Sequence, residues 1–283
     1  MKEKKNKLYM TALLALTFMI VFSGCNSSEQ ANGEVHSEQE EQQAESSNRG
    51  MGWTHEHPVT PTAGTWKALE FKDGSSYKVD TPPANDSDET KKELEDLKKL
   101  IENRTAEDVE FIKHWQNTAS PNTLWLEMTE ELIHKYGLMG PESARVHAIV
   151  SGAIYTSLTA TFQAKYEYLR PRPTDLDPSI QLPEGMMVPP HPSYPSGHTA
   201  TAWTSAYILS YFFPNEKAQL EEIADKVALS REQMGIHFKS DNDAAKEIAQ
   251  AVTKDIIESL KADNAPAQYA EVKNTGSSHG AGH

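Results

Sequence analysis

Ser193-Tyr194-Pro195-Ser196-Gly197-His198-Thr199 is a turn of small residues that ends in a histidine and leads into an apolar segment. Prolines at 189, 190, 192 and 195 keep its approach extended, because each fixes its own φ angle and disfavours helix at the preceding residue. Residues 199–213 are predicted to be a helix, so the turn lies at a helix N-terminus. Unpaired backbone N–H groups and the helix dipole favour a bound anion there. The stretch therefore predicts an anion-binding turn and the helix that follows it.

Helical periodicity dominates the chain on both sides of this turn. A helix that begins at Pro141 and runs past Ala164 is apolar or small nearly all round, which is typical of a helix in the centre of a bundle. Few strand signals and no internal repeat are visible. The fold class is therefore predicted to be all-α, a helical bundle over residues 85–262. The other predicted helices cover residues 88–104, a segment that starts at Thr105, and residues 124–136, 216–231 and 237–260.

The N-terminus has the pattern of an export signal. Four lysines in the first seven residues precede an apolar run over residues 8–22, and small residues close the segment before Cys25, the single cysteine. Residues 1–24 are predicted to be a signal peptide, and the site resembles the lipobox of bacterial lipoproteins, in which the cysteine becomes lipidated. An ordinary secretory signal and a retained membrane anchor are the alternatives. All three predict an extracytoplasmic protein, and the first predicts attachment to the bacterial cell membrane through Cys25.

The segments that flank the predicted bundle differ from it in composition. Residues 25–50 are polar with almost nothing apolar, which predicts a disordered acidic tether. Residues 51–84 contain two tryptophans, several prolines and a Lys72-Asp73-Gly74-Ser75 turn, which predicts an extended arm or a hairpin. Residues 263–283 predict a disordered tail. His55-Glu56-His57 lacks a further spaced ligand, so no metal site is predicted.

The balance of charge restricts the class of partner. The chain has 283 residues and a formal net charge of −14, and the predicted leader is basic, so the rest is more acidic still. This acidity argues against nucleic-acid binding and against electrostatic adhesion to anionic lipid. A local cluster of cations must therefore hold any anionic substrate. The length suits one large domain, and no oligomeric state is predicted.

Three segments contribute residues suited to oxyanion chemistry. Two guanidinium groups and an ammonium can neutralise a tetrahedral oxyanion, while the Ser196 hydroxyl and the Gly197 N–H add donors. His237 and Asp241 are four residues apart, so the carboxylate can fix the imidazole tautomer and leave the other nitrogen as a nucleophile. His198 is interpreted as the acid that protonates the leaving oxygen and then activates water. The candidate residues are Lys165 and Arg172; Ser196, Gly197 and His198; and Arg231, His237 and Asp241.

These segments together resemble the signature of a known superfamily. The pattern is Lys165, six residues, Arg172-Pro173; then Pro195-Ser196-Gly197-His198; then Ser230-Arg231, five residues, His237, three residues, Asp241. It is similar to the three-part signature of the type 2 phosphatidic acid phosphatases and vanadium haloperoxidases. The resemblance covers about residues 64–258 and implies a helical bundle with one oxyanion site. Arg170 duplicates the arginine-proline pair at the wrong distance from Lys165, so it is interpreted as a charge behind the site or on the surface.

The resemblance implies two possible activities. One is hydrolysis of phosphate esters through a phosphohistidine on His237, and the other is oxidation of halide with hydrogen peroxide by vanadate held on the same histidine. Residues 193–199 and 240–244 resemble the soluble class A bacterial acid phosphatases, whereas residues 64–67 and 235–238 resemble bacterial haloperoxidase-related proteins. The membrane-embedded lipid phosphatases of the superfamily have many apolar spans, which this chain lacks.

We therefore expect an extracytoplasmic phosphatase that acts on a small phosphorylated substrate and needs no cofactor. The alternative is a haloperoxidase that needs vanadate. A second alternative is a surface lipoprotein without catalytic activity that binds an anion or a partner.

Overall fold

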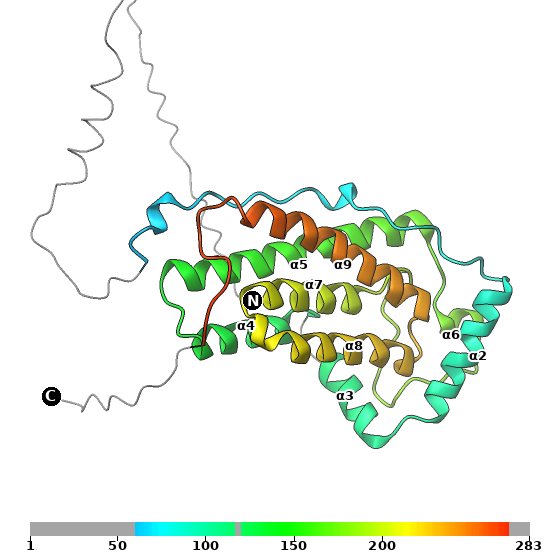
Figure 1. Ribbon diagram of the computed structural model, residues 1–283. Coiled ribbons are helices and arrows are strands. Elements are labelled where there is room, and N and C mark those ends of the chain that lie inside the picture. Colours follow the sequence, from blue (N-terminus) through cyan, green and yellow to red (C-terminus); the bar gives the residue numbers. More distant parts are fainter. Residues whose placement is uncertain (1–59, 117–119, 272–283) are drawn as a thin grey trace, which may run out of the picture. The chain divides into compact units, whose positions relative to one another are not determined.

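The computed structural model describes residues 60–116 and 120–271. Within these residues the chain is a helical bundle with no β-strand, which confirms the predicted fold class (Figure 1). The predicted leader, Cys25 and the acidic tether lie outside the described residues. The helices are α2 (Asp88–Glu102), α3 (Ala106–Gln116), α4 (Thr123–Lys135), α5 (Pro141–Tyr168), α6 (Pro173–Leu176), α7 (Gly197–Phe212), α8 (Lys217–Met234) and α9 (Lys239–Leu260), and the 3₁₀ turns are η1 (Ala63–Thr65), η2 (Gly74–Ser76) and η3 (Pro214–Glu216).

Helix α7 is the centre of the bundle. It carries no Asp, Glu, Lys or Arg, and its small residues Ala200, Ala202 and Ala206 are fully buried. Helices α5, α8 and α9 pack around it, and Figure 1 shows it between them. Small side chains allow close approach of neighbouring helices, and burial of apolar area on every face stabilises the arrangement. The turn that opens α7 is thereby held at one end of the buried helix.

The sequence predicts α5 as the central helix, and the structure places it at the side. Tyr155 is 70% exposed and Tyr166 is 59% exposed, so one face of α5 meets solvent. That face contains Ala, Ser and Tyr rather than charged residues. A face of this composition cannot be distinguished from a buried one by periodicity alone.

The N-terminal arm crosses the bundle in an extended conformation. Between residue 60 and the start of α2 it forms the turns η1 and η2 and no hairpin. Tyr77 is buried and donates to Asp255 on α9, while the hydroxyl of Tyr194 donates to the carbonyl of Asp80 at 2.7 Å. The arm therefore contacts both the last helix and the turn before α7.

The first part of the predicted disordered tail is packed, so that prediction is wrong for residues 263–271. Asp263 is 5% exposed and accepts hydrogen bonds from Arg145 Nε at 3.1 Å and Nη2 at 2.7 Å. Tyr269 is 9% exposed, and its N–H donates to the carbonyl of Phe212. One buried ion pair and one aromatic ring thus attach a segment of otherwise small and polar residues. Residues 272–283 lie outside the described part.

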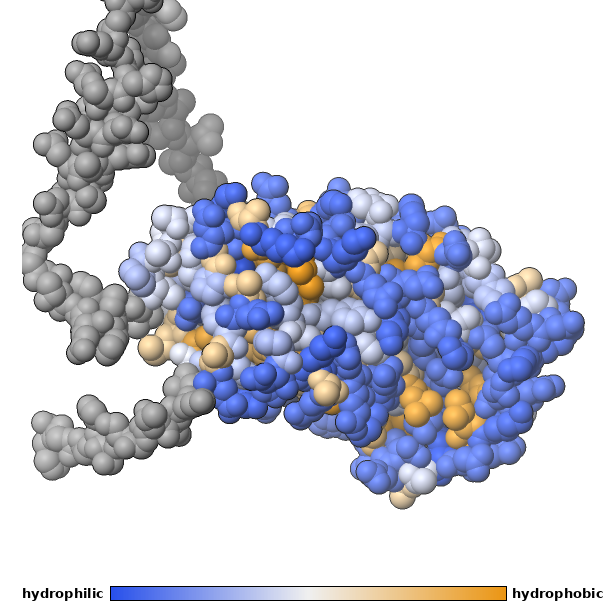
Figure 2. All heavy atoms as spheres, in the orientation of Figure 1, coloured by the Kyte–Doolittle hydropathy of each residue, from blue (hydrophilic) through white to orange (hydrophobic). Residues whose placement is uncertain are grey.

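The described residues include no helix that is both long and apolar enough to cross a membrane. Hydrophilic side chains cover most of the face shown in Figure 2, and the exposed apolar residues form small separate patches.

Gly74 tests the contact between the arm and α5. A Cβ atom at this buried glycine would lie 2.3 Å from Thr159 Oγ1 and 2.5 Å from the backbone nitrogen of Ala160. We expect Gly74→Ala to lower the free energy of unfolding by about 1–3 kcal/mol, because the backbone of α5 cannot move aside. Gly64→Ala is the matched control: no atom lies within 4 Å of its Cβ position, and its effect should stay within about 0.5 kcal/mol. Equal urea unfolding curves for the two variants would contradict the contact.

Candidate active site

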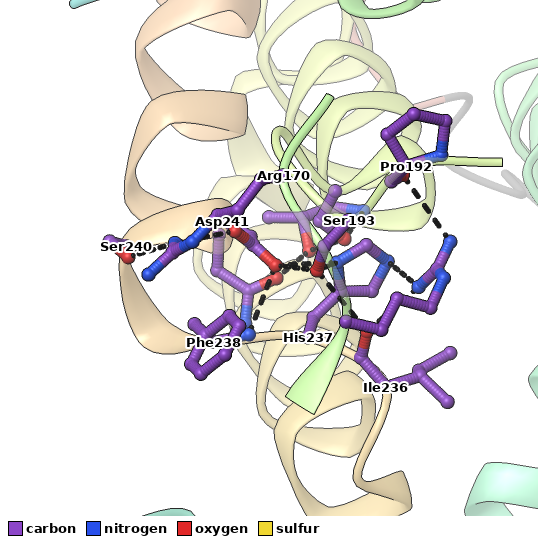
Figure 3. A network of polar contacts seen from close by, with 12 residues as sticks. Arg170, Pro192, Ser193, Ile236, His237, Phe238, Ser240 and Asp241 are labelled. Atoms are coloured by element: carbon purple, nitrogen blue, oxygen red, sulfur yellow. Dashed lines mark hydrogen bonds and ion pairs between the residues drawn. The ribbon is translucent and has the colours of Figure 1, made fainter. Parts of the chain in front are cut away.

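His237 and Asp241 lie at the start of α9. Gly235, with a φ of 89°, ends α8 and turns the chain back. Helix α9 begins at Lys239, two residues after the predicted helix start at His237. The carboxylate oxygen Oδ2 of Asp241 lies 3.0 Å from Nδ1 of His237 and also accepts the N–H of Phe238 at 3.0 Å (Figure 3). A carboxylate only accepts, so Nδ1 carries the hydrogen. The lone pair of His237 is therefore on Nε2.

Arg172 and Lys165 reach this histidine from α5 and the segment after it. Leu169, in the left-handed region, ends α5, and Arg172 follows as the N-cap of α6. Nη1 of Arg172 donates to the carbonyl of Ile236 at 2.7 Å and lies 3.3 Å from His237 Nε2, which agrees with a lone pair on that nitrogen. Nζ of Lys165 donates to the carbonyls of Pro192 and Ser193 at 2.7 and 2.9 Å. The predicted pair of cations is thus brought together beside His237.

Arg231 supplies the third predicted cation from the last turn of α8. Its side chain is fully buried. Nη1 donates to Oε1 of Gln116 at 2.9 Å, and Nε and Nη2 both donate to the hydroxyl of Ser230, at 3.0 and 2.9 Å. Three hydrogen bonds to two neutral acceptors therefore fix its guanidinium plane without neutralising its charge.

In the described residues, none of these three buried cations forms an ion pair with a carboxylate. Burial, followed by the charge of Arg172, lowers the pKa of Lys165 to about 7. Burial also lowers the pKa of Arg172 to about 10 and that of Arg231 to about 9. Buried charges without partners are costly. A bound oxyanion would offset that cost for all three cations at once.

The turn before α7 presents backbone donors, while its serine side chain caps the helix. Ser196 Oγ accepts the N–H of Thr199 at 3.4 Å and lies 2.9 Å from Thr199 Oγ1, which itself donates to Asn242 at 2.6 Å. The predicted bond from the Ser196 hydroxyl to an oxyanion stays a prediction, since the hydroxyl would first have to leave Thr199. The N–H groups of Gly197 and His198 have no hydrogen-bond partner in the described chain. They are the donors that the structure offers to an anion.

A cavity of about 390 Å³ opens onto these residues. His198 and His237 both line it, together with Gly197. Burial, and next the charge of Arg231, holds the pKa of His198 well below its usual value. Burial, and next the charges of Arg172 and Lys165, does the same for His237. Both imidazoles are therefore neutral before an anion arrives. The other lining residues are Gln116, Ser120, Pro121, Leu158, Phe162, Pro189, His191 and Ile236.

Three residues outside the candidate catalytic and anion-binding set also contact this site. Arg170 is 2% exposed, and its Nη1 donates to Asp241 Oδ1 at 2.8 Å, so the surface alternative for Arg170 is wrong. The Ser193 hydroxyl donates to Asp241 Oδ2, and His191 Nδ1 accepts from Arg172 at 3.1 Å. The repeated arginine-proline pair was the signal for Arg170, whereas Ser193 and His191 carry no spacing signal. No group of three metal-ligating side chains occurs in residues 60–116 or 120–271.

Comparisons with known proteins agree with this arrangement. Residues 145–246 match the model of the PAP2 superfamily, a range that contains every predicted site residue from Lys165 to Asp241. A non-specific acid phosphatase from Providencia stuartii is 30% identical over 117 residues, which are 40% of this chain and 47% of the relative. The chain thus spans about half the length of this curated relative.

Two solved structures share the fold. A bacterial vanadium-dependent iodoperoxidase superposes with a TM-score of 0.57 at 19% identity, over 65% of this chain and 53% of the other. The apo form of a bacterial vanadium-dependent chloroperoxidase superposes with a TM-score of 0.56 at 16% identity, over 73% of this chain and 57% of the other. The bundle therefore has the helical fold of the PAP2 and vanadium haloperoxidase proteins.

The depressed pKa of Lys165 predicts a dependence of stability on pH. Its ordinary value is 10.5 and its folded value about 7, so between these values the unfolded chain binds more protons, and stability rises with pH. Lys165→Met removes this contribution, which is at most about 1.4 kcal/mol per pH unit. Urea unfolding at about pH 7 and 9.5, without oxyanion, should show a smaller rise for the variant. The exposed Lys254→Met is the control, and equal rises in all three proteins would contradict the prediction.

Proposed function

Because the chain carries a PAP2 superfamily domain at residues 145–246, we propose that it is an extracytoplasmic phosphatase that hydrolyses small phosphate esters through a phosphohistidine. One observation carries this proposal. Three buried cations, none paired with a carboxylate in the described residues, act on a histidine whose Nδ1 is held by Asp241: Arg172 Nη1 lies 3.3 Å from its Nε2, and the charges of Lys165 and Arg231 also lower its pKa. The similarity to an acid phosphatase supports a phosphate ester as the substrate.

In the first step the ester oxyanion lies between Lys165, Arg172 and Arg231. The lone pair of His237 Nε2 attacks phosphorus, and the bond from phosphorus to the ester oxygen breaks. His198 gives its proton to that leaving oxygen. His198 is neutral in the empty site, and the negative charge of the bound ester raises its pKa so that it can carry this proton. Asp241 stabilises the positive charge that His237 gains.

In the second step water replaces His237 on phosphorus. Neutral His198 now accepts a proton from the attacking water, the P–N bond breaks, and its electron pair returns to Nε2. Phosphate leaves, and with the anion's charge gone His198 releases the proton it took from water to solvent, so both histidines are neutral again. The cations and the Gly197 N–H stabilise the charge on the equatorial oxygens in both steps. No metal or organic cofactor takes part.

Halide oxidation is the alternative, because vanadate has the shape and charge of phosphate. Lys165, Arg172, Arg231 and the Gly197 N–H would hold it, and His237 Nε2 would be its protein ligand. Bound vanadate would supply peroxide activation there. The two peroxidases with the same fold motivate this alternative, although similarity at their level of identity concerns the fold alone.

A turnover assay separates these functions. Purified protein should release p-nitrophenol from p-nitrophenyl phosphate without added metal, with vanadate as a competitive inhibitor that resembles the transition state. His237→Ala should lower kcat/KM by about 10³-fold or more, and Asp241→Asn by less, because it misorients the imidazole. His134→Ala, which changes an exposed histidine of α4, is the control. Intact cells should hydrolyse the same ester if the protein is extracytoplasmic.

The same samples give the outcomes that oppose the proposal. An alkaline quench should trap phosphate on wild-type protein and none on His237→Ala. Bromination of a dye with vanadate, peroxide and bromide, without phosphate release, would establish the peroxidase instead. Absence of both activities, with phosphate affinity unchanged in His237→Ala, would favour the non-catalytic lipoprotein.

A further inference from the structure

Arg170 lies directly behind the proposed nucleophile pair. It follows the end of α5, and its Nη1 donates to Asp241 Oδ1 at 2.8 Å and to Ser240 Oγ at 2.7 Å (Figure 3). The guanidinium carbon lies 4.1 Å from the centre of the Phe238 ring, which fixes its plane by a cation–π contact. Arg170 does not line the cavity. Its terminal nitrogens donate to Ser240, Asp241, Thr90 and Glu93, so the guanidinium is engaged by protein groups at the Asp241 oxygen that does not contact His237.

Glu93 holds Arg170 from a different part of the fold. This residue of α2 is 13% exposed at its side chain, and its Oε2 accepts from Arg170 Nη2 at 3.0 Å. The same oxygen accepts from the Ser240 hydroxyl at 2.9 Å, and Oε1 accepts the Ser240 N–H at 2.7 Å. Glu93 thus pairs with Arg170 and at the same time caps the N-terminus of α9. One carboxylate from α2 fixes both sides of the contact between Arg170 and Asp241.

The two oxygens of Asp241 have separate partners. Oδ1 faces Arg170, whereas Oδ2 accepts from His237 Nδ1, the Phe238 N–H and the Ser193 hydroxyl. The carboxylate cannot rotate without breaking bonds on both sides. The charges alternate from Glu93 through Arg170 to Asp241 and end at an imidazole that becomes positive when it forms a bond to phosphorus. Removal of a positive charge from this series favours the imidazolium form of His237, and removal of a negative charge disfavours it.

We propose that Glu93 and Arg170 are positioning residues that act through Asp241 to set the orientation and the basicity of His237. This inference rests on the proposed phosphatase function for its effect on turnover, and on geometry alone for its effect on the imidazole. Arg170 moderates the negative charge that Asp241 directs at His237. Glu93 in turn offsets part of the charge of Arg170. The two residues therefore influence His237 with opposite sign.

Substitution at the two positions distinguishes this relay from an ordinary buried ion pair. Arg170→Met leaves Asp241 without its cation, so the imidazolium is favoured and the pKa of His237 rises. Glu93→Gln leaves Arg170 uncompensated, so Asp241 stabilises the imidazolium less and the pKa of His237 falls. If the pair were purely structural, both substitutions would lower the stability of the protein, and they would not shift the pKa of His237 in opposite directions. Arg145→Met is the matched control, because Arg145 and Asp263 form an equally buried pair at the other end of α5.

The direct readout is the nitrogen chemical shifts of His237 in protein labelled with ¹⁵N-histidine and titrated with acid. Absence of the signal in His237→Gln assigns it. The wild-type protein should show the Nδ1–H tautomer, Arg170→Met should move the titration to higher pH, and Glu93→Gln should move it to lower pH. Arg145→Met should leave it in place. These variants leave unchanged the charged and titratable groups that face His237. Those groups are Asp241, Lys165, Arg172, Arg231, His191 and His198.

Turnover gives an independent readout. With p-nitrophenyl phosphate, Arg170→Met should lower kcat between about 10-fold and 100-fold, the range known for outer hydrogen-bond partners of metal-bound histidines, while KM changes little. If Arg170→Met does not fold, Arg170→Lys keeps the charge but has one terminal nitrogen, so it cannot reproduce the two-nitrogen contact with Asp241 and Glu93. Glu93→Gln still tests the opposite sign. Titration shifts that are absent, or equal in sign for both positions, would overturn the relay. Opposed shifts in a protein without phosphatase activity would keep the relay and refute the proposed function.

Discussion

The structure depends on the burial of three cations that no carboxylate in the described residues neutralises. Lys165, Arg172 and Arg231 are held instead by backbone carbonyls, a serine hydroxyl and an amide. Such an arrangement lowers the stability of the empty protein, so the surrounding packing must supply the difference. It also prepares the site, because a tetrahedral oxyanion that enters meets charges already in position and displaces no carboxylate.

The bundle provides that packing through its central helix. Helix α7 carries no Asp, Glu, Lys or Arg and is largely buried, and Gly197 and His198 at its N-terminus line the same cavity as His237. His237 lies just before α9 and Asp241 lies in its first turn, and the backbone N–H of Ser196 donates to the carbonyl of Asp241 at 2.9 Å. The two helix starts are thus joined directly. The proposed acid His198 and the proposed nucleophile His237 lie at these two joined helix starts, which favours one fixed geometry for reaction.

Sequence reasoning identified the parts of the site that local spacing encodes. The interval of four residues between His237 and Asp241 brought them into contact even though α9 begins only at Lys239. The pairing of Glu93 with Arg170 joins residues 77 positions apart, and no local pattern encodes it. The same holds for Arg145 and Asp263, which order a segment whose composition predicts disorder. Burial of α5 was overestimated because the exposed face around Tyr155 is uncharged.

A crystal structure of the protein soaked with orthovanadate tests the central claim most directly. The account predicts vanadium bonded to His237 Nε2, with Lys165, Arg172, Arg231 and the Gly197 N–H in contact with its equatorial oxygens and His198 on the opposite side. It also predicts that Gln116 gives up its place beside Arg231 if an oxygen takes it. Vanadate bound elsewhere, or bound in the cavity without contact to the three cations, would contradict the account.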